Sequence, residues 1–320
     1  MPPRTVGCGF GAARGALTLS PSLFAYGTDA SFYRLNPRIV VKIASEAEAQ
    51  RILPLALKHN TPVTFRAAGT SLSGQAVTDS VMLKLSHGGK AFRNYEIKAR
   101  AASPALRRPH NLDTPRLTPR VLQEGGRVVV VEPGLIGGEV NRLLAAYAKK
   151  HNLPDRYKIG PDPSSIDSCM LGGIVANNSS GMCCGVAQNT FHTLRDMRVV
   201  LADGTLLDTA DPASRASFKR THAKLLAGIA ELATRVQSDS SLVSLIKRKF
   251  AIKCTTGYSI NALLLPPAEP IEILKRLMIG SEGTLGFVSQ ARQKSGKRPD
   301  AGARALPTSH VLTKPPPPPP

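Results

Sequence analysis

Residues 160–185 read GPDPSSIDSCMLGGIVANNSSGMCCG, with small or polar residues at positions where a core segment would be apolar. The stretch holds five glycines, five serines and two adjacent asparagines. Such a segment buries little apolar surface of its own, so side-chain packing does not explain it. Two hypotheses remain: a disordered spacer, or a backbone that closely approaches a non-protein group, which glycine permits because it has no Cβ.

The rest of the chain has the composition of a globular protein. With 320 residues, 42% of them hydrophobic, it can form one large domain or two smaller ones. No uninterrupted apolar run reaches the ~18 residues that a membrane span needs, so no transmembrane segment is expected. The five cysteines form no CxxC pair and are odd in number, which disfavours a metal site and a disulfide framework. Buried thiols are the favoured interpretation, with proximity of Cys183 and Cys184 to a ligand as the alternative.

The net charge of +20 raises the hypothesis of nucleic-acid binding. The basic residues concentrate in 90–127 and beyond 291, in segments without helical or strand periodicity. No aromatic residues alternate with the charges of the tail, and no zinc-finger or helix-turn-helix signature is present. Solvated segments explain the charge at least as well. We therefore expect no nucleic-acid partner and keep a basic nucleic-acid-binding protein as a second alternative.

The pattern along the chain predicts three regions. Residues 1–29 form an N-terminal extension with weak targeting-peptide character, which favours a cytoplasmic or mitochondrial location. Residues 30–290 form the folded domain, interrupted by an inserted basic loop at 98–124. Residues 291–320 form a disordered tail rich in basic residues and proline. The expected elements are strands at 39–43, 62–65, 81–85 and 127–131, a helix capped by Ser45, a hairpin at Asp203-Gly204, helices within 215–248, and a helix, turn and strand over 272–289.

Four stretches combine glycine with small hydroxyl or amide residues: 66–76, 132–141, 160–185 and 280–286. In such loops successive backbone N–H groups can converge on an anion, and hydroxyls add further donors. No GxxxxGK[ST] motif is present, and no GxGxxG follows the first strand, so a P-loop NTPase and a Rossmann site are disfavoured. Each loop alone is more typical of a structural turn than of a ligand cradle. Four such loops in one chain, each at a strand or helix end, favour a site for a phosphate-bearing ligand.

The motifs PVTFRAAGTSLSGQAV, GPDPSSIDSCMLGGIVANNSSGMCCG and IGSEGTLGFVSQA resemble those of the vanillyl-alcohol-oxidase-type FAD-linked oxidases. More narrowly, the chain is similar to the D-2-hydroxy-acid dehydrogenases that act on D-lactate, glycolate and D-2-hydroxyglutarate. The resemblance covers about residues 30–290. It implies an α+β fold, a PCMH-type FAD-binding domain of two α+β subdomains with FAD between them. It stops before the family's substrate-covering domain, which we therefore expect to be absent, so that the chain is truncated relative to the family.

The resemblance also implies FAD as the cofactor and a set of contacts to it. Arg66 begins the first loop, and a surface or packing role for its side chain is about as well supported as a cofactor contact. We expect no covalent flavin attachment, because the 66–76 loop holds no histidine or cysteine. The expected FAD-binding residues are Arg66, Gly69, Thr70, Ser71, Leu72, Ser73 and Gly74 for the pyrophosphate, Pro133 and Gly134 beside the flavin, Pro161, Asp162, Gly172, Gly173, Asn177, Asn178, Ser179 and Gly181 for the isoalloxazine and ribityl side, and Glu282, Gly283, Thr284 and Gly286 for the adenosine end.

The function implied by the resemblance is hydride transfer from the α-carbon of a D-2-hydroxy acid to flavin N5. The expected partners are FAD and a small 2-hydroxy-acid substrate, with the electron acceptor and the catalytic residues unassigned. The alternative is a catalytically incomplete FAD-binding fragment.

Overall fold

The computed structural model describes residues 16–17, 20–86, 92–98, 127–153, 157–181, 185–255 and 257–297. The predicted inserted loop lies outside these residues except for Lys98, and so does the predicted tail beyond Lys297. Cys183 and Cys184 also lie outside them.

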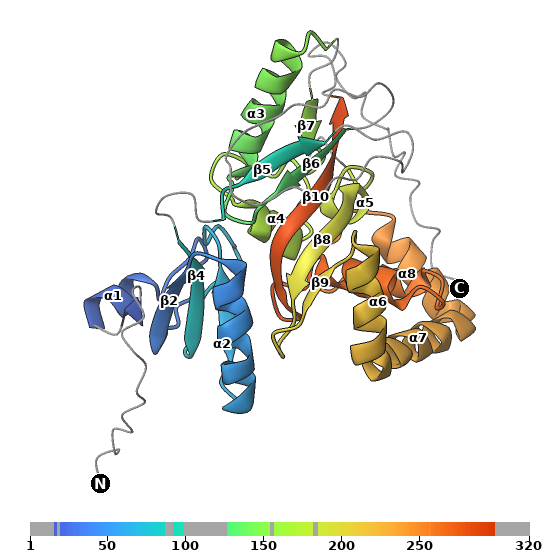
Figure 1. The fold of residues 1–320 in the computed structure, drawn as a ribbon, viewed down its shortest axis with the longest axis horizontal. Helices are drawn as coiled ribbons and strands as arrows, with labels where there is room; N and C mark the ends of the chain where they lie inside the picture. The colour runs from blue at the N-terminus through green and yellow to red at the C-terminus, as the bar shows by residue number, and fades with distance from the viewer. Residues whose placement is uncertain are drawn as a thin grey trace, which may run out of the picture.

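A small, mainly parallel sheet forms the first part of the molecule (Figure 1). β2 and β3 run parallel to β4 between them, while β1 is antiparallel to β2. Helix α2 connects β2 to β3, and Ser45 caps it by accepting a hydrogen bond from the Glu48 amide at 3.3 Å, which confirms the predicted cap. The elements are β1 (Ala16–Leu17), α1 (Ser20–Ala25), β2 (Ile39–Ile43), α2 (Glu46–Lys58), β3 (Val63–Arg66) and β4 (Val81–Leu85).

A larger antiparallel sheet forms the second part, with the order β5-β6-β10-β8-β9 and with β7 paired to β10. Its long strand β10 runs through the centre of the molecule (Figure 1). The strands are β5 (Tyr95–Lys98), β6 (Arg127–Val131), β7 (Tyr157–Ile159), β8 (Leu194–Val200), β9 (Leu206–Asp208) and β10 (Phe287–Lys297). The helices are α3 (Gly137–Lys150), α4 (Leu171–Ala176), α5 (Thr190–Thr193), α6 (Pro212–Thr221), α7 (Ala223–Ser238), α8 (Ser240–Phe250), the 3-10 helix η1 (Ile260–Leu264) and α9 (Pro270–Met278). This mixed architecture is the predicted α+β class. No helix in the described ranges has the length and apolar character needed to cross a bilayer.

The structure corrects the predicted region boundaries. Residues 291–297 are the second half of β10, at the centre of the large sheet, so the prediction that they begin a disordered tail is wrong. Their sequence hides the strand because Gln293 and Ser295 are polar yet buried, and the Gln293 side chain accepts a hydrogen bond from the Thr193 hydroxyl at 3.1 Å. Lys98 ends β5 rather than beginning a loop, and part of the predicted N-terminal extension supplies β1 and α1.

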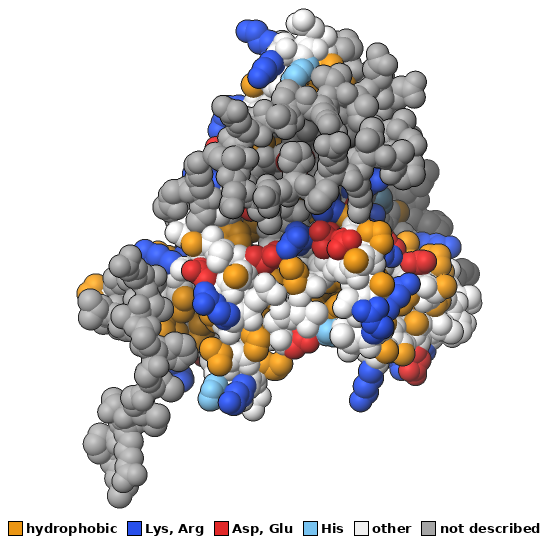
Figure 2. All heavy atoms as spheres, in the orientation of Figure 1, with side chains coloured by type: hydrophobic (Ala, Val, Ile, Leu, Met, Phe, Trp, Pro, Cys, Tyr) orange, Lys and Arg blue, Asp and Glu red, His pale blue; other side chains and the backbone are white. Residues whose placement is uncertain are grey.

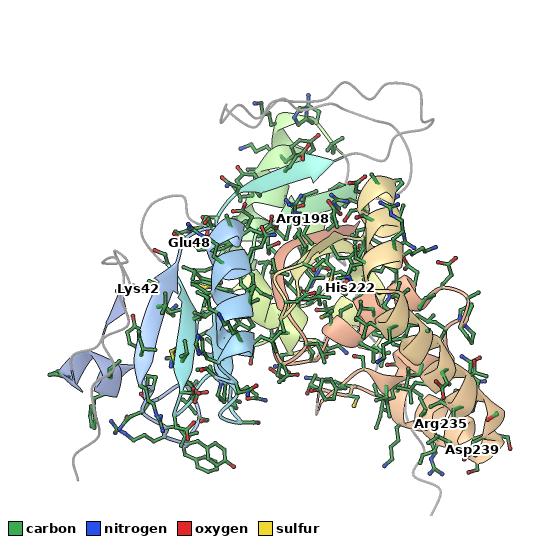
Figure 3. The ribbon with its side chains drawn as sticks, turned by 60° about the horizontal axis from the view of Figure 1, so that its bottom comes forward. Lys42, Glu48, Arg198, His222, Arg235 and Asp239 are labelled. Carbon is green, nitrogen blue, oxygen red and sulfur yellow. The ribbon has the colours of Figure 1, made fainter. Side chains whose placement is uncertain are left out.

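The two parts meet where α2 packs near β8 and β10. The Phe287 ring of β10 lies 5.2 Å from the Phe65 ring of β3, centroid to centroid, within a shared apolar cluster. Around this cluster, Arg198 of β8 donates two hydrogen bonds to the Glu46 carboxylate, at 3.1 and 2.7 Å. Figure 3 shows Arg198 near the N-terminal end of α2, and Figure 2 shows acidic and basic side chains side by side across the described part of one face. An apolar contact inside and the Arg198–Glu46 ion pair outside therefore link the two parts.

Candidate functional site

A cavity of about 770 Å³ opens between the two parts. The small sheet contributes the end of β3 and the loop after it, and the larger part contributes segments around 162–181 and 278–288. Phe65, Phe287 and Leu85 from the shared apolar cluster also line it. Three of the four glycine-rich stretches, far apart in sequence, therefore line one space, while the fourth (132–141) reaches it through Pro133.

The loop 66–76 forms one wall of this cavity. It leaves the carboxyl end of the parallel strand β3, and Gly69 adopts a φ of +75°, which an L-residue rarely takes. A Cβ on Gly69 would also lie 2.7 Å from a terminal guanidinium nitrogen of Arg66. The guanidinium donates hydrogen bonds to the carbonyls of Tyr26 (3.1 Å), Thr28 (2.7 Å) and Ala76 (3.4 Å). These contacts establish the packing role of Arg66; because it also lines the cavity, its predicted contact with the cofactor stays a prediction.

The stretch 160–181 forms the opposite wall, and two of its glycines, Gly172 and Gly181, pack tightly against neighbouring segments. A Cβ on Gly172 would lie 2.8 Å from Cβ of Pro133, and one on Gly181 would lie 1.7 Å from the carbonyl oxygen of Asp162. The Gly172 amide donates to the Pro133 carbonyl at 2.9 Å. The wall is thus built by backbone segments that approach more closely than any side chain allows.

The same stretch contains an unpredicted helix, α4, with one apolar and one small-residue face. Leu171, Ile174 and Val175 are buried in the core of the larger part, so the expectation that this segment buries little apolar surface is wrong for them. Gly172, Gly173 and Ala176 line the cavity. The helix therefore joins the protein core to the cavity wall.

Gly173 is the position where a cradle for a ligand is clearest. It lies inside α4 with helical backbone, so no special φ requires glycine there. A Cβ built on it meets no atom within 4 Å, although the neighbouring glycines are tightly packed. Neither backbone conformation nor protein packing explains the missing side chain. The free space at this point fits a flat group lying against the helix.

The loop 280–286 borders the cavity from a third side. The amides of Gly280 and Glu282 donate to the carbonyls of Val175 (3.2 Å) and Ala176 (2.9 Å), which ties the loop to the end of α4. Glu282 has a φ of +54°, a strained value for a residue with a Cβ. Glu282 lines the cavity, and burial raises the pKa of its carboxyl to about 7. Thr284 instead lines a side pocket of about 150 Å³, together with Glu282 and Gly283.

Most of the sequence-predicted site residues line the cavity, and a few do not. Gly134, Gly74 and Asn178 have packing roles: Gly134 lies against the Phe92 carbonyl, Gly74 against the Tyr33 ring, and the Asn178 side chain accepts a hydrogen bond from the Phe191 amide at 2.9 Å. The predicted residues that line the cavity are Arg66, Gly69, Thr70, Ser71, Leu72, Ser73, Pro133, Asp162, Gly172, Gly173, Asn177, Ser179, Gly181, Glu282, Gly283 and Gly286. Those that do not are Gly74, Gly134, Pro161, Asn178 and Thr284.

Sequence reasoning missed one segment of the site. Lys253 and Thr255, in the connection after α8, line the cavity, and the polar run KCTTGY was the signal that went unused. Cys169, one of the predicted buried thiols, also lines it, and burial raises the pKa of its thiol, which keeps it protonated at neutral pH. Among the described residues no group of histidine, cysteine, aspartate and glutamate is arranged to hold a metal ion.

Positive charge prevails around the cavity. Arg66 and Lys253 contribute cations, while the Asp162 carboxylate is compensated by Lys158 at 2.7 Å. Glu282 is only partly ionised near neutral pH because of its raised pKa. With a glycine loop at one wall and free space over α4 at the other, the donor set fits an anionic ligand that carries a flat ring system.

Comparison with known proteins identifies the family. The sequence profile of the FAD binding domain family matches residues 37–103 and 111–210. D-2-hydroxyglutarate dehydrogenase of Pantoea ananatis is 25% identical over 270 residues, which are 83% of this chain and 23% of that protein. Glycolate oxidase subunit GlcD of Escherichia coli (strain K12) is 30% identical over 179 residues, 55% of this chain and 29% of that protein. The chain thus spans about a quarter of the length of these relatives.

A likeness to a solved structure supports the fold. Alkyldihydroxyacetonephosphate synthase superposes with a TM-score of 0.51 at 15% sequence identity, over 91% of this chain and 43% of that one. The matched profile covers more than half of the chain. The chain therefore belongs to the FAD binding domain family, with the PCMH-type α+β fold and with FAD as its cofactor.

Proposed function

We propose that the chain binds FAD in the 770 Å³ cavity and forms the flavin-binding part of a D-2-hydroxy-acid dehydrogenase. The observation that carries the placement of the cofactor is Gly173, a glycine of α4 whose missing side chain leaves free space at the cavity wall. The relatives D-2-hydroxyglutarate dehydrogenase and glycolate oxidase subunit GlcD support the substrate class, a small 2-hydroxy acid.

Each wall has its own task in this proposal. The amides and hydroxyls of the 66–76 loop bind the diphosphate, because they supply donors without the bulk of long side chains. Gly172, Gly173 and the polar residues after α4 orient the isoalloxazine ring and the ribityl chain. Glu282 and the glycines that follow it cover the adenosine end. When bound, FAD supplies the acceptor, flavin N5, for hydride from the substrate α-carbon.

A second candidate is a cofactor-binding unit that takes up FAD without turning over a substrate alone. The observation in its favour is the extent of the chain, which matches 23% and 29% of the two relatives' lengths. We assign no catalytic base or substrate clamp to the described residues.

One experiment distinguishes these candidates. The purified protein is loaded with FAD, and its absorption spectrum is recorded without oxygen. D-2-hydroxyglutarate, D-lactate or glycolate is then added, with the L-enantiomers of the two chiral acids as controls. A yellow protein bleached by one of these acids supports the dehydrogenase. A yellow protein that none of them bleaches supports the cofactor-binding unit. A folded protein that takes up no FAD, or that retains nucleic acid in a salt-dependent manner instead, contradicts both.

A further inference from the structure

Three cationic side chains share one register across the small sheet. Lys42 of β2 pairs with Lys84 of β4, and Lys84 pairs with Arg66 of β3, all in parallel strands, so their side chains leave the same face. Their exposure differs: Lys42 is exposed, whereas Lys84 is 4% exposed. Figure 3 marks Lys42 on this sheet. A buried lysine lies at the carboxyl end of the sheet, where the cavity loop begins.

Lys84 and Arg66 hold the two ends of the 66–76 loop. The Lys84 ammonium group donates a hydrogen bond to the Ala67 carbonyl at 2.5 Å, and the Arg66 guanidinium donates to the Ala76 carbonyl at 3.4 Å. Ala67 and Ala76 both line the cavity. The conformation of the loop therefore depends on two cations that approach it from the sheet.

The charges around Lys84 leave this region positive. Burial and the neighbouring cations Arg66 and Lys42 lower the pKa of Lys84 to about 8. On the preceding segment, Asp29 and the Tyr26 hydroxyl act on Arg66, and the Asp29 carboxylate also accepts a hydrogen bond from the Ala76 amide at 3.4 Å. The Asp29 carboxylate thus acts on Arg66, at one end of the row of three cations. An anion on the cavity side of the loop would reduce the cost of keeping the two shielded cations, Lys84 and Arg66, charged.

We propose that Lys84 is a positioning residue for the cofactor's diphosphate: it fixes the start of the 66–76 loop through Ala67 and, with Arg66, supplies positive charge that the diphosphate offsets. This inference rests on the proposed function. It predicts that the affinity for the phosphate part of the ligand depends on Lys84, whereas the affinity for the flavin ring does not.

The proposal has a pH signature. A bound diphosphate favours the charged ammonium and raises the pKa of Lys84 above its value of about 8 in the free protein. The extra affinity is therefore complete below about pH 8 and is lost as pH rises towards the pKa of the complex. Replacing Lys84 by methionine removes this dependence, because no titrating group is left at that position.

The test measures dissociation constants of FAD, ADP and riboflavin for the full chain at pH 7 and pH 9.5. The variants are Lys84→Met, Lys84→Arg and, as a matched control, Lys42→Met, which removes an exposed cation from the same row. We expect Lys84→Met to weaken FAD and ADP about tenfold at pH 7 and riboflavin less than about twofold. We expect Lys84→Arg to retain most of the FAD affinity and to abolish its loss at pH 9.5, and Lys42→Met to behave nearly as the wild type does.

The outcomes separate this inference from the proposed function. Equal FAD affinity of the wild type and Lys84→Met overturns the inference and leaves FAD binding intact. A loss shared equally by riboflavin and FAD shows a purely structural lysine and also overturns it. Should Lys84→Met fail to fold, the wild-type profile decides: weaker FAD binding at pH 9.5 with unchanged riboflavin binding supports the inference, and a flat profile overturns it. A folded wild type that binds no FAD contradicts the proposed function itself.

Discussion

The two main walls of the cavity are held in place by different means. The 66–76 loop is held by charged side chains, since Arg66 and Lys84 donate hydrogen bonds to carbonyls at its two ends. The 160–181 wall is held by close backbone packing, because Gly172 and Gly181 leave no room for a Cβ beside Pro133 and Asp162. Charged side chains therefore fix the conformation of the 66–76 loop, and close steric packing fixes the conformation of the 160–181 wall.

The difference separates two kinds of glycine that look alike in the sequence. Gly181 is required by the protein itself, whereas Gly173 adjoins open space. We therefore expect a substitution at Gly181 to lower the stability of the fold and a substitution at Gly173 to weaken ligand binding. Comparing stability with FAD affinity for the same variant distinguishes the two.

We expect the largest effect from Gly181→Ala. Its Cβ would lie 1.7 Å from the Asp162 carbonyl oxygen, a backbone atom that cannot rotate away. The backbone must shift, and we expect the free energy of unfolding to fall by about 3 kcal/mol, with FAD retention falling as well. Thermal unfolding of the apoprotein measures the first effect and flavin content the second. Wild-type stability of Gly181→Ala would disprove the close packing at this wall.

For Gly173→Val we expect unchanged stability of the apoprotein but a large loss of FAD affinity. A Cβ at this position meets no protein atom within 4 Å outside its own helix, and replacing glycine within a helix does not reduce its stability, so we expect the apoprotein to keep its melting temperature or gain slightly. In the cavity, the branched side chain takes the space assigned to the flavin. We expect FAD affinity to fall at least about 100-fold, or about 2.7 kcal/mol. Fluorescence titration with FAD measures this loss.

Gly173→Ala serves as the graded control, with a smaller loss of affinity than the valine variant. Undiminished flavin content in folded Gly173→Val would show that the ring system does not lie against α4.

The junction between the two parts offers a prediction of intermediate size. The Glu46 carboxylate accepts hydrogen bonds from Arg198 and from the Ser289 hydroxyl, and so links α2 to β8 and β10. Both ion-pair partners are partly shielded from solvent. We expect Glu46→Gln to lower the free energy of unfolding by about 1.5 kcal/mol and to speed FAD release, because the two walls can then separate more easily.

The exposed pair of Asp167 with Arg142, at 3.1 Å, provides the control for the junction. Asp167→Asn should leave stability within about 0.5 kcal/mol of the wild type. If both variants unfold alike, the junction does not depend on its ion pair.

Much of the fold could be predicted from the periodicity of apolar residues, and the elements that were missed share one cause. The strands at 39–43, 81–85 and 127–131 and the helix capped by Ser45 are confirmed because their apolar patterns match their buried faces. The second half of β10 was missed because a central strand of polar sequence, with Gln293 buried, shows no apolar alternation. Partners distant in sequence compensate for part of this polarity, as the Thr193 hydroxyl does for the Gln293 side-chain oxygen. Local patterns cannot reveal such compensation.

The candidate site was likewise predictable only in part. The motif residues of the 66–76 and 160–181 stretches do line the cavity, but the sequence could not tell Gly173 from Gly181, because neither spacing nor residue type records what a Cβ would meet. The apolar pattern predicts a strand at 81–85 but indicates no role for Lys84 within it. Its importance emerges only from the parallel pairing that places it beside Arg66 and beneath Ala67.

Glu282→Gln tests the third side of the cavity and has the smallest expected effect. Burial raises the pKa of Glu282 from 4.5 to about 7, so the folded protein binds its proton more tightly than the unfolded chain does. The apoprotein therefore loses stability as pH rises from about 4.5 to about 7, and above pH 7 the penalty is constant. Allowing for solvent screening of this partly exposed group, we expect a penalty of about 1 kcal/mol at pH 8. Glutamine keeps the shape without the charge, so Glu282→Gln should be more stable than the wild type by this amount at pH 8 and equal to it near pH 4.5. Melting temperatures of the two apoproteins at both pH values measure the difference, and a constant difference across the range would show that the carboxyl at this side of the cavity titrates as it does in water.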